Sequence, residues 1–176
     1  ITLTKEFAKH ALSRSQANAP VSRTRNTYEL PDTFVSLSRN LDAELYVRSV
    51  YAYDAYLSGR ADIRYDFKRN RVVFLVKDGN KVVDAVGRSI DGRNPKWYRY
   101  GNSRKPFIVG DSDQAVIVED CGSACSISDR VTGVALLGTS LLQEYIPSLL
   151  NYQKIYVALD KDATDKAIDM VKILCR

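Results

Sequence analysis

From Gln114 to the end of the chain, short apolar stretches alternate with segments of helical pattern. Apolar runs suited to strands lie at residues 115–118, 133–136 and 155–159. Helices are expected at residues 122–128, 141–150 and 163–174, and Pro147 should kink or shorten the second of them. Strands that alternate with helices imply a parallel sheet with right-handed crossovers. The sequence therefore predicts an α/β fold for this part of the chain.

The preceding residues have a different pattern. Apolar spacing over residues 40–57 predicts one or two helices, closed by Ser58-Gly59. We expect their tyrosines to be core and boundary residues rather than a base-stacking platform (Tyr46, Tyr51, Tyr53 and Tyr56). Two apolar runs, 71–76 and 81–86, flank an Asp-Gly turn and predict a β-hairpin. Residues 88–105 indicate a loop.

These patterns divide the 176 residues into three parts. Residues 1–30 form a basic leading segment, with a helix expected around residues 5–12 followed by a linker. Residues 31–112 form a basic α+β subdomain, and residues 113–176 form the α/β domain. Because the chain begins with Ile1, we expect a piece of a longer protein.

Charge favours an anionic partner. The net charge is +5 and the pI about 9.1, with Lys and Arg concentrated between Lys68 and Lys105. Nucleic acid is the first candidate, and a basic solubilising surface is the alternative. Three cysteines without C-x-x-C spacing argue against a disulfide framework and against a zinc site in this chain. Without an apolar run of ~18 residues, no membrane span is expected. A reducing, cytoplasmic compartment fits these features.

Acidic residues follow two of the expected strands. Glu119 comes directly after residues 115–118, and Asp160 after residues 155–159. Ligands of open α/β sheets bind at such carboxyl ends. Asp162 lies two residues further on, and an extended backbone would send it to the same side as Asp160. The three carboxylates make a Mg²⁺ (or Mn²⁺) site plausible. The alternative is that Asp162 caps a helix with Asp165 at its third position, while Asp120 is a surface charge.

Several ordered motifs resemble the Toprim primase family across roughly residues 30–173. The run Val116-Ile-Val-Glu-Asp-Cys-Gly-Ser-Ala124 is similar to its strand-then-glutamate motif. Val134-Ala-Leu-Leu-Gly-Thr-Ser-Leu141 resembles its glycine-threonine segment, and Val157-Ala-Leu-Asp-Lys-Asp162 its D-x-D strand. Upstream, Gly87-Arg88, Pro95-Lys-Trp-Tyr98, Asn102-Ser103 and residues 107–110 are similar to the basic template- and nucleotide-binding stretch of bacterial primases.

The resemblance implies a DNA primase core that synthesises RNA primers on single-stranded DNA from ribonucleoside triphosphates. Glu119, Asp160 and Asp162 would be the catalytic metal ligands. The residues that would bind nucleic acid or nucleotide are Arg88, Lys96, Trp97, Arg99, Asn102, Ser103, Arg104, Lys105, Gly138 and Thr139. Phosphoryl transfer relies on positioning and charge neutralisation, which such a set can supply. We also expect Trp97, Tyr98 or Tyr100 to stack on a base or to brace an Arg.

The chain departs from the family pattern at three places. Ser123 stands where the family usually has an Asp, Ala163-Thr164 replaces a small Ala-Gly pair, and the chain ends before the usual further acidic strand. A truncated or reduced Toprim unit is therefore expected. A zinc module and a replicative helicase would be partners outside these residues. The compact motifs suggest a protein of a phage or mobile element, which would act in the cytoplasm or nucleoid of the bacterial host.

Two other functions stay open. A Toprim fold also supports a metal-dependent nuclease. Alternatively, Ser123 and the missing zinc module permit a catalytically weak fold kept as a DNA-binding or replisome-docking module.

Overall fold

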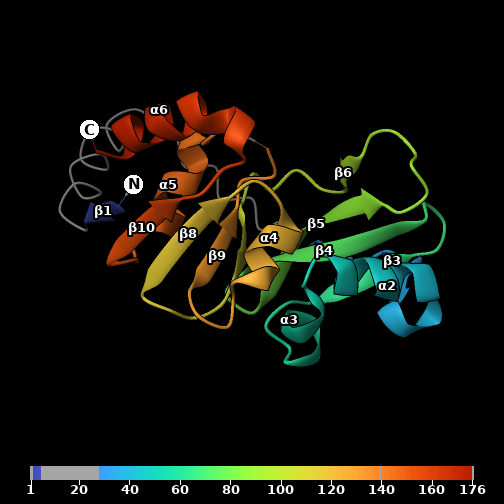
Figure 1. Cartoon of the computed structure of the whole chain (residues 1–176). Coiled ribbons are helices and arrows are strands. Elements are labelled where there is room, and N and C mark those ends of the chain that lie inside the picture. Colours follow the sequence, from blue (N-terminus) through green and yellow to red (C-terminus); the bar gives the residue numbers. More distant parts are fainter. Residues whose placement is uncertain (1, 5–27, 139, 176) are drawn as a thin grey trace.

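The computed structural model describes residues 2–4, 28–138 and 140–175, which form two sheets (Figure 1). The first sheet has the strand order β1-β10-β8-β9-β7. Its strands are β1 (Thr2–Thr4), β10 (Lys154–Val157), β8 (Gln114–Val118), β9 (Thr132–Ala135) and β7 (Phe107–Val109). The three central strands are parallel, and β1 and β7 run antiparallel at the two edges. The predicted α/β fold with a parallel sheet is confirmed.

The second sheet is antiparallel throughout, in the order β2-β3-β4-β5-β6. Its strands are β2 (Phe34–Ser36), β3 (Ile63–Asp66), β4 (Arg71–Asp78), β5 (Lys81–Ser89) and β6 (Trp97–Arg99). The predicted hairpin is β4–β5, and it turns at Gly79, whose φ of +60° suits glycine. The predicted loop at residues 88–105 is interrupted by β6, because Trp97 to Arg99 pair with the end of β5.

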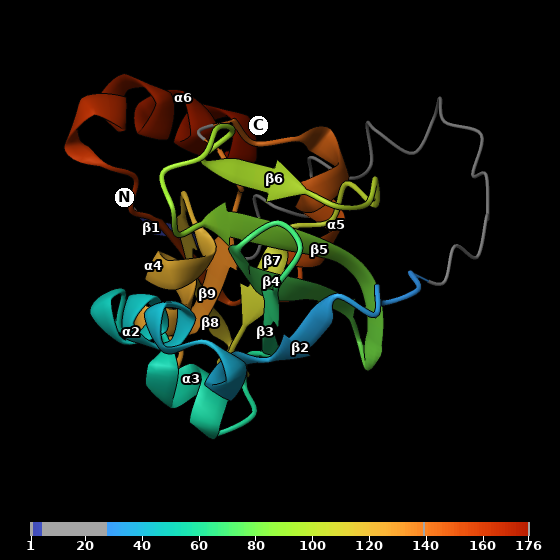
Figure 2. The same ribbon diagram turned by 90° about the vertical axis from the view of Figure 1, so that its right-hand side faces the viewer.

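Two helices precede β3, as the apolar spacing predicts. They are α2 (Leu41–Ser49) and α3 (Tyr53–Leu57). The Asn40 side chain caps α2 by accepting the Ala43 N–H at 2.8 Å. Ser58 ends α3, and Gly59 then takes a φ of +75°. Figure 2 shows both helices on the side of the molecule that carries α4.

The tyrosines of this region confirm the prediction in three cases and contradict it in one. Tyr46, Tyr53 and Tyr56 are partly buried against the core. Tyr51 is 79% exposed, so the prediction of a core or boundary role is wrong for this residue. The reason is its position after α2, where a φ of 57° turns the chain toward α3.

The core has two main parts, one on each face of the parallel sheet. On one face, Ala115, Ile117, Val134 and Ile155 pack with residues of α5 and α6. On the other face, Val118 and Ala135 pack with α4 and with residues of α2 and the antiparallel sheet. These helices are α4 (Cys121–Ser126), α5 (Ile146–Leu149) and α6 (Thr164–Leu174). Figure 1 shows α5 and α6 above the sheet and α4 on its other side.

Helix α4 approaches β9 very closely. A Cβ on Gly133 would lie 2.3 Å from the Ala124 carbonyl oxygen, so only glycine allows this contact. The predicted helix at residues 141–150 is reduced to a 3-10 turn, η2 (Gln143–Tyr145), followed by the four-residue α5 with Pro147 near its start. None of the described helices is long and apolar enough to cross a membrane.

Strands β1, β2, β3 and β7 were not expected from the pattern. Strand β7 precedes residue 113 yet pairs with β9, so the first sheet includes a strand from the segment assigned to the basic subdomain. The division of the chain into three parts stays a prediction. The helix expected around residues 5–12 lies outside the described residues.

Candidate active site

Two of the three predicted carboxylates lie together at the carboxyl ends of neighbouring parallel strands. Glu119 directly follows β8, and Asp160 lies three residues beyond β10. The Ala158 N–H donates to the Ile117 carbonyl at 2.9 Å, which extends the pairing past the end of β10. The Asp160 N–H then donates to Oε1 of Glu119 at 3.2 Å. The strand ladder therefore fixes the Glu119 carboxylate beside Asp160.

These carboxylates form one wall of a cavity of about 270 Å³. The antiparallel sheet supplies further lining residues: Arg88 on β5, Lys96 just before β6, and Trp97 on β6. Asp120, Leu137 and Gly138 complete the lining. The fold thus brings an acidic edge of one sheet against a basic edge of the other. We call this space the active-site cavity.

Arg88 has the least satisfied side chain of this cavity. Its Nε is buried and has no hydrogen-bond partner among the described residues. Its guanidinium carbon lies 5.5 Å from the centre of the Trp97 ring and 5.9 Å from that of Tyr46. Burial raises the pKa of Tyr46 to about 12, and nearby Arg88 lowers it only in part, so the ring stays neutral beneath the cation. The rings hold Arg88 in place without neutralising its charge.

Asp162 does not join the two carboxylates. It lies in the middle of a single 3-10 turn, η3 (Lys161–Ala163), and it is exposed. It is absent from the lining of the active-site cavity. Among the described residues, no group of three or more Asp, Glu, His or Cys side chains is arranged to hold a metal ion. The structure does not bring the three carboxylates together, because the backbone leaves the extended conformation after Asp160, and the role of Asp162 as a metal ligand stays a prediction.

The alternative that Asp162 caps the last helix is wrong, and Asp120, expected to be a surface charge, caps α4. Ala163 precedes α6, and no side chain caps the start of this helix. Asp120 precedes α4, and its carboxylate accepts the Ser123 N–H at 3.0 Å and the Ser123 hydroxyl at 3.2 Å. Ser123 thus completes a local cap.

Most of the other predicted basic residues form ion pairs within the protein. The Arg99 Nε lies 2.6 Å from Oδ2 of Asp84, and Arg99 also donates to the Lys105 carbonyl at 2.7 Å. Arg104 pairs with Glu144 at 2.6 Å, and Lys105 with Asp78 at 3.2 Å. None of these three lines the active-site cavity. The structure therefore gives Arg99 a role in holding the chain together.

Asp84 organises this segment. Its side chain is fully buried, and it accepts the Ala85 N–H (2.7 Å), the Gly101 N–H (2.8 Å), and both the N–H and the hydroxyl of Ser103 (3.1 and 3.0 Å), besides Arg99. Burial alone would raise the pKa of Asp84, but the hydrogen bonds from Arg99 and the backbone outweigh it and lower the pKa. Sequence reasoning missed Asp84, since its partners lie up to 19 residues away.

The remaining predicted residues fall in different places. Gly138 lines the active-site cavity, whereas Thr139 lies outside the described residues. Ser103 is bound to Asp84, and Asn102 is exposed. The prediction that an aromatic ring braces an Arg is confirmed: Trp97 contacts Arg88, and the Tyr98 ring lies 4.6 Å from the Arg69 guanidinium carbon.

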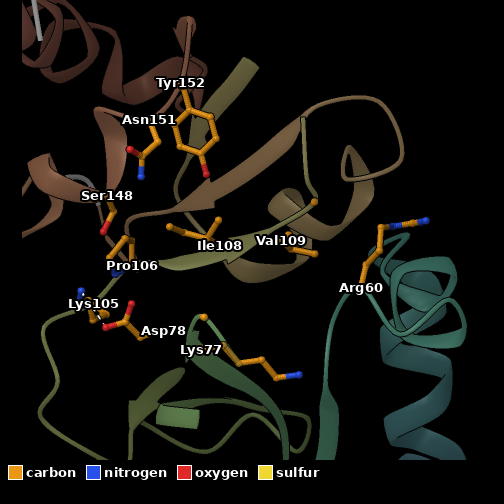
Figure 3. A pocket seen from close by; sticks show the side chains of 12 residues that line it. Arg60, Lys77, Asp78, Lys105, Pro106, Ile108, Val109, Ser148, Asn151 and Tyr152 are labelled. Carbon is orange, nitrogen blue, oxygen red and sulfur yellow. Dashed lines mark ion pairs between the residues drawn. The ribbon is translucent and has the colours of Figure 1, made fainter. Parts of the chain in front are cut away.

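A second cavity, of about 360 Å³, lies along strand β7 and is called the β7 cavity (Figure 3). Its lining includes Lys105, Asp78, Lys77, Tyr152 and Arg60. Figure 3 shows the Lys105–Asp78 ion pair at one end and Arg60 at the other. The Nε of Arg60 donates to the Ser128 hydroxyl at 3.2 Å. Basic residues thus line this cavity too.

Comparison with known proteins found similar structures but no match in sequence. No family model matches the chain, and no curated protein matches it in sequence. The structural neighbours are primase domains. One is a DNA primase domain from Pseudomonas aeruginosa, with 20% identity, a TM-score of 0.49, and coverage of 69% of this chain and 46% of that one. Another is the DnaG primase catalytic domain bound to single-stranded DNA, with 18% identity, a TM-score of 0.48, and coverage of 78% and 48%.

A third neighbour is the E. coli primase catalytic core, with 17% identity, a TM-score of 0.45, and coverage of 80% of this chain and 53% of that one. The chain spans about half the length of these solved structures.

Proposed function

We propose that this chain is the catalytic core of a DNA primase, which joins ribonucleotides into short RNA primers on single-stranded DNA. The observation that carries the proposal is that Glu119 and Asp160 line the same cavity as Arg88 and Lys96. Nucleotidyl transfer needs this combination, because negative charge gathers on the reacting phosphate and must be neutralised and positioned. In the reaction a 3′ hydroxyl attacks the α-phosphorus of a triphosphate and releases pyrophosphate.

Glu119 and Asp160 are the proposed metal ligands. Two carboxylates suit Mg²⁺, which keeps several waters and takes its remaining ligands from substrate phosphates. Bound there, Mg²⁺ or Mn²⁺ would supply a Lewis acid for the phosphoryl oxygens. Arg88 and Lys96 would hold the phosphates, and the Asp160 N–H keeps the Glu119 carboxylate oriented. A zinc module and a helicase would be partners outside these residues.

The test is primer synthesis by Asp160→Asn with single-stranded DNA, ribonucleotides and Mg²⁺. We expect activity to fall by about a hundredfold or more, because each charged group that stabilises the transition state contributes on that scale. The variant should remain folded, since Asp160 is exposed and its side chain caps nothing. Asp169→Asn, an exposed acid on α6, is the matched control and should keep full activity. Full activity in Asp160→Asn would refute the proposal.

Metal binding provides a second measurement that does not depend on activity. Removing metal leaves two nearby carboxylates, so Mg²⁺ should raise the melting temperature of the wild type more than that of Asp160→Asn. Equal increases in both proteins would contradict the assignment of metal ligands.

One observation favours a second candidate, a Toprim fold that binds single-stranded DNA without chemistry. Asp162 does not line the active-site cavity, so the site has fewer carboxylates than the resemblance implies. Binding of DNA by the wild type with neither RNA products nor nicked DNA would support this candidate. Nicked DNA would support the nuclease alternative.

A further inference from the structure

A third cavity adjoins the active-site cavity and extends it toward α2. Its volume is about 390 Å³, and it shares with the active-site cavity the residues Arg88, Lys96, Trp97 and Asp120. Tyr51 and Val50, which follow the end of α2, line the third cavity but not the active-site cavity. The shared wall makes one groove that begins at Glu119 and Asp160 and ends at an aromatic residue.

Tyr51 is the unusual member of this groove. Helix α2 ends at Ser49, and Tyr51 lies two residues beyond it with a φ of 57°, a position where glycine or asparagine is the relaxed choice. The N–H groups of Tyr51 and Ala52 donate to the carbonyls of Arg48 and Val47, both at 3.0 Å, which fixes this conformation. A bulky residue therefore occupies a strained backbone position.

Packing does not account for that choice. The Tyr51 side chain is 79% exposed, and none of the close ring–ring or cation–ring contacts of the described residues includes it. An exposed ring carried by a fixed backbone offers a flat apolar face to a ligand. Strain of this kind gathers at binding sites, where the surrounding structure maintains it.

The charge of the groove defines the ligand further. Arg88 and Lys96 form no ion pair with any described residue, so both can neutralise phosphate. An aromatic face next to two unpaired cations suits a nucleotide unit, whose base stacks while its phosphate is bound by the cations. A purely apolar ligand would leave both charges unused.

We propose that this groove is a nucleobase subsite in which Tyr51 stacks on one unpaired base and Arg88 and Lys96 hold the phosphate attached to that nucleotide. This subsite rests on the proposed primase function, because it would be a contact between that site and its substrate. Its geometry concerns binding only. The base could belong to a single-stranded DNA or to a free ribonucleoside triphosphate, and the chemistry is the same for both.

The experiment measures binding without metal in four variants. Stacking contributes ~1–3 kcal/mol per base, so Tyr51→Ala should weaken affinity by about fivefold or more. Tyr51→Phe should bind like the wild type, because it keeps the ring. Tyr51→Gly should bind as weakly as Tyr51→Ala while melting at a higher temperature, because glycine relieves the strain at φ 57°. Phe67→Ala, which removes another exposed ring outside the groove, is the matched control and should bind normally.

Two ligands separate the two sources of the base. Single-stranded DNA carrying 2-aminopurine reports stacking through quenching of its fluorescence. Titration with a ribonucleoside triphosphate is followed through Trp97, the single tryptophan of the chain, which lines both cavities. A loss confined to DNA assigns the subsite to the strand, and a loss confined to the triphosphate assigns it to the nucleotide; both support the subsite.

Unchanged affinity for both ligands in Tyr51→Ala and in Tyr51→Gly would overturn the subsite. That outcome leaves the primase proposal standing, because the latter depends on the activity of Asp160→Asn. Conversely, full activity in Asp160→Asn would refute the proposed function without changing the binding measured for the Tyr51 variants.

Discussion

The active-site cavity and the β7 cavity are similar in size, about 270 and 360 Å³, and basic side chains line both. In the β7 cavity both lysines are ion-paired, because Lys105 lies 3.2 Å from Asp78 and Lys77 lies 3.8 Å from Asp62, while Arg60 donates to the Ser128 hydroxyl. In the active-site cavity, Arg88 and Lys96 have no such partner among the described residues, and they line the same cavity as the carboxylates of the other sheet. The first arrangement fixes the chain, whereas the second leaves charge available to a ligand.

The comparison teaches that the position of a charge in the sequence does not locate a binding surface. The segment from Arg88 to Lys105 contains six basic residues, yet only two of them line the active-site cavity. The other four each have an acidic partner, whereas Arg88 and Lys96 have none among the described residues. Substitutions of paired residues should therefore affect stability, and substitutions of unpaired residues should affect binding.

The largest effect is expected from Asp84→Ala, on the paired side of the comparison. The substitution removes a fully buried carboxylate and leaves the Arg99 guanidinium, 28% exposed, without its partner. Breaking such a pair costs about 3–5 kcal/mol, because an uncompensated charge and several N–H donors stay buried. Chemical denaturation should show this loss in the free energy of unfolding. A loss below 1 kcal/mol would mean that the ion pair does not hold residues 99–105.

The pH dependence of stability provides a second test of the role of Asp84. Its pKa is lowered in the folded protein from the ordinary value of 3.8, so its contribution to stability is complete above about pH 4 and is lost as the pH falls through the lower folded value. Wild-type stability should therefore decrease on acidification below pH 4. Asp84→Ala should show a smaller decrease over the same range.

A smaller effect, on binding alone, should distinguish the two cavities directly. Arg88→Ala should weaken single-stranded DNA binding by about tenfold or more at low salt, because hydrogen bonds to charged groups contribute about 1.5–3 kcal/mol. It should also reduce the slope of log affinity against log salt by ~0.7, the value for one phosphate on a single strand. Lys105→Ala, in the β7 cavity, is the matched control and should change neither quantity.

Equal losses of DNA affinity in Arg88→Ala and Lys105→Ala would contradict the contrast between the two cavities. That result would mean that Lys105 exchanges Asp78 for phosphate when DNA binds, and that the ion pair at 3.2 Å does not mark a structural role.

Much of the α/β part could be predicted, because its strands are continuous apolar runs between helices. Strands β8 and β9 and the hairpin β4–β5 lie where the pattern places them. Strands β3 and β7 have four and three residues and were not recognised, because neither is an apolar run between helices. Segments this short are stabilised by pairing with β4 and β9 rather than by their own propensity.

The candidate site likewise contains residues that could be predicted from the sequence and residues that could not. Glu119 and Asp160 were predictable, because acids that follow parallel strands meet at one sheet edge. Arg99 was not, because its partner Asp84 lies 15 residues away on β5 and meets it through the pairing of β5 with β6. The sequence gives the charge of each residue, and only the fold decides which charges meet.

The smallest effect is expected from Asp162→Asn. The prediction of a shared metal site assumed an extended backbone from Asp160 to Asp162, but η3 begins at Lys161 and removes that alternation. Asp162 is exposed, caps no helix and does not line the active-site cavity. The variant should therefore keep primer synthesis within about twofold, with unfolding free energy within ~0.5 kcal/mol, as for other surface positions. Loss of activity in Asp162→Asn equal to that in Asp160→Asn, with unchanged stability, would show instead that residues 160–163 rearrange when substrate binds. In that case the unpaired cations of the active-site cavity would face three carboxylates in the working enzyme, and the contrast with the β7 cavity would be sharper than the described structure makes it.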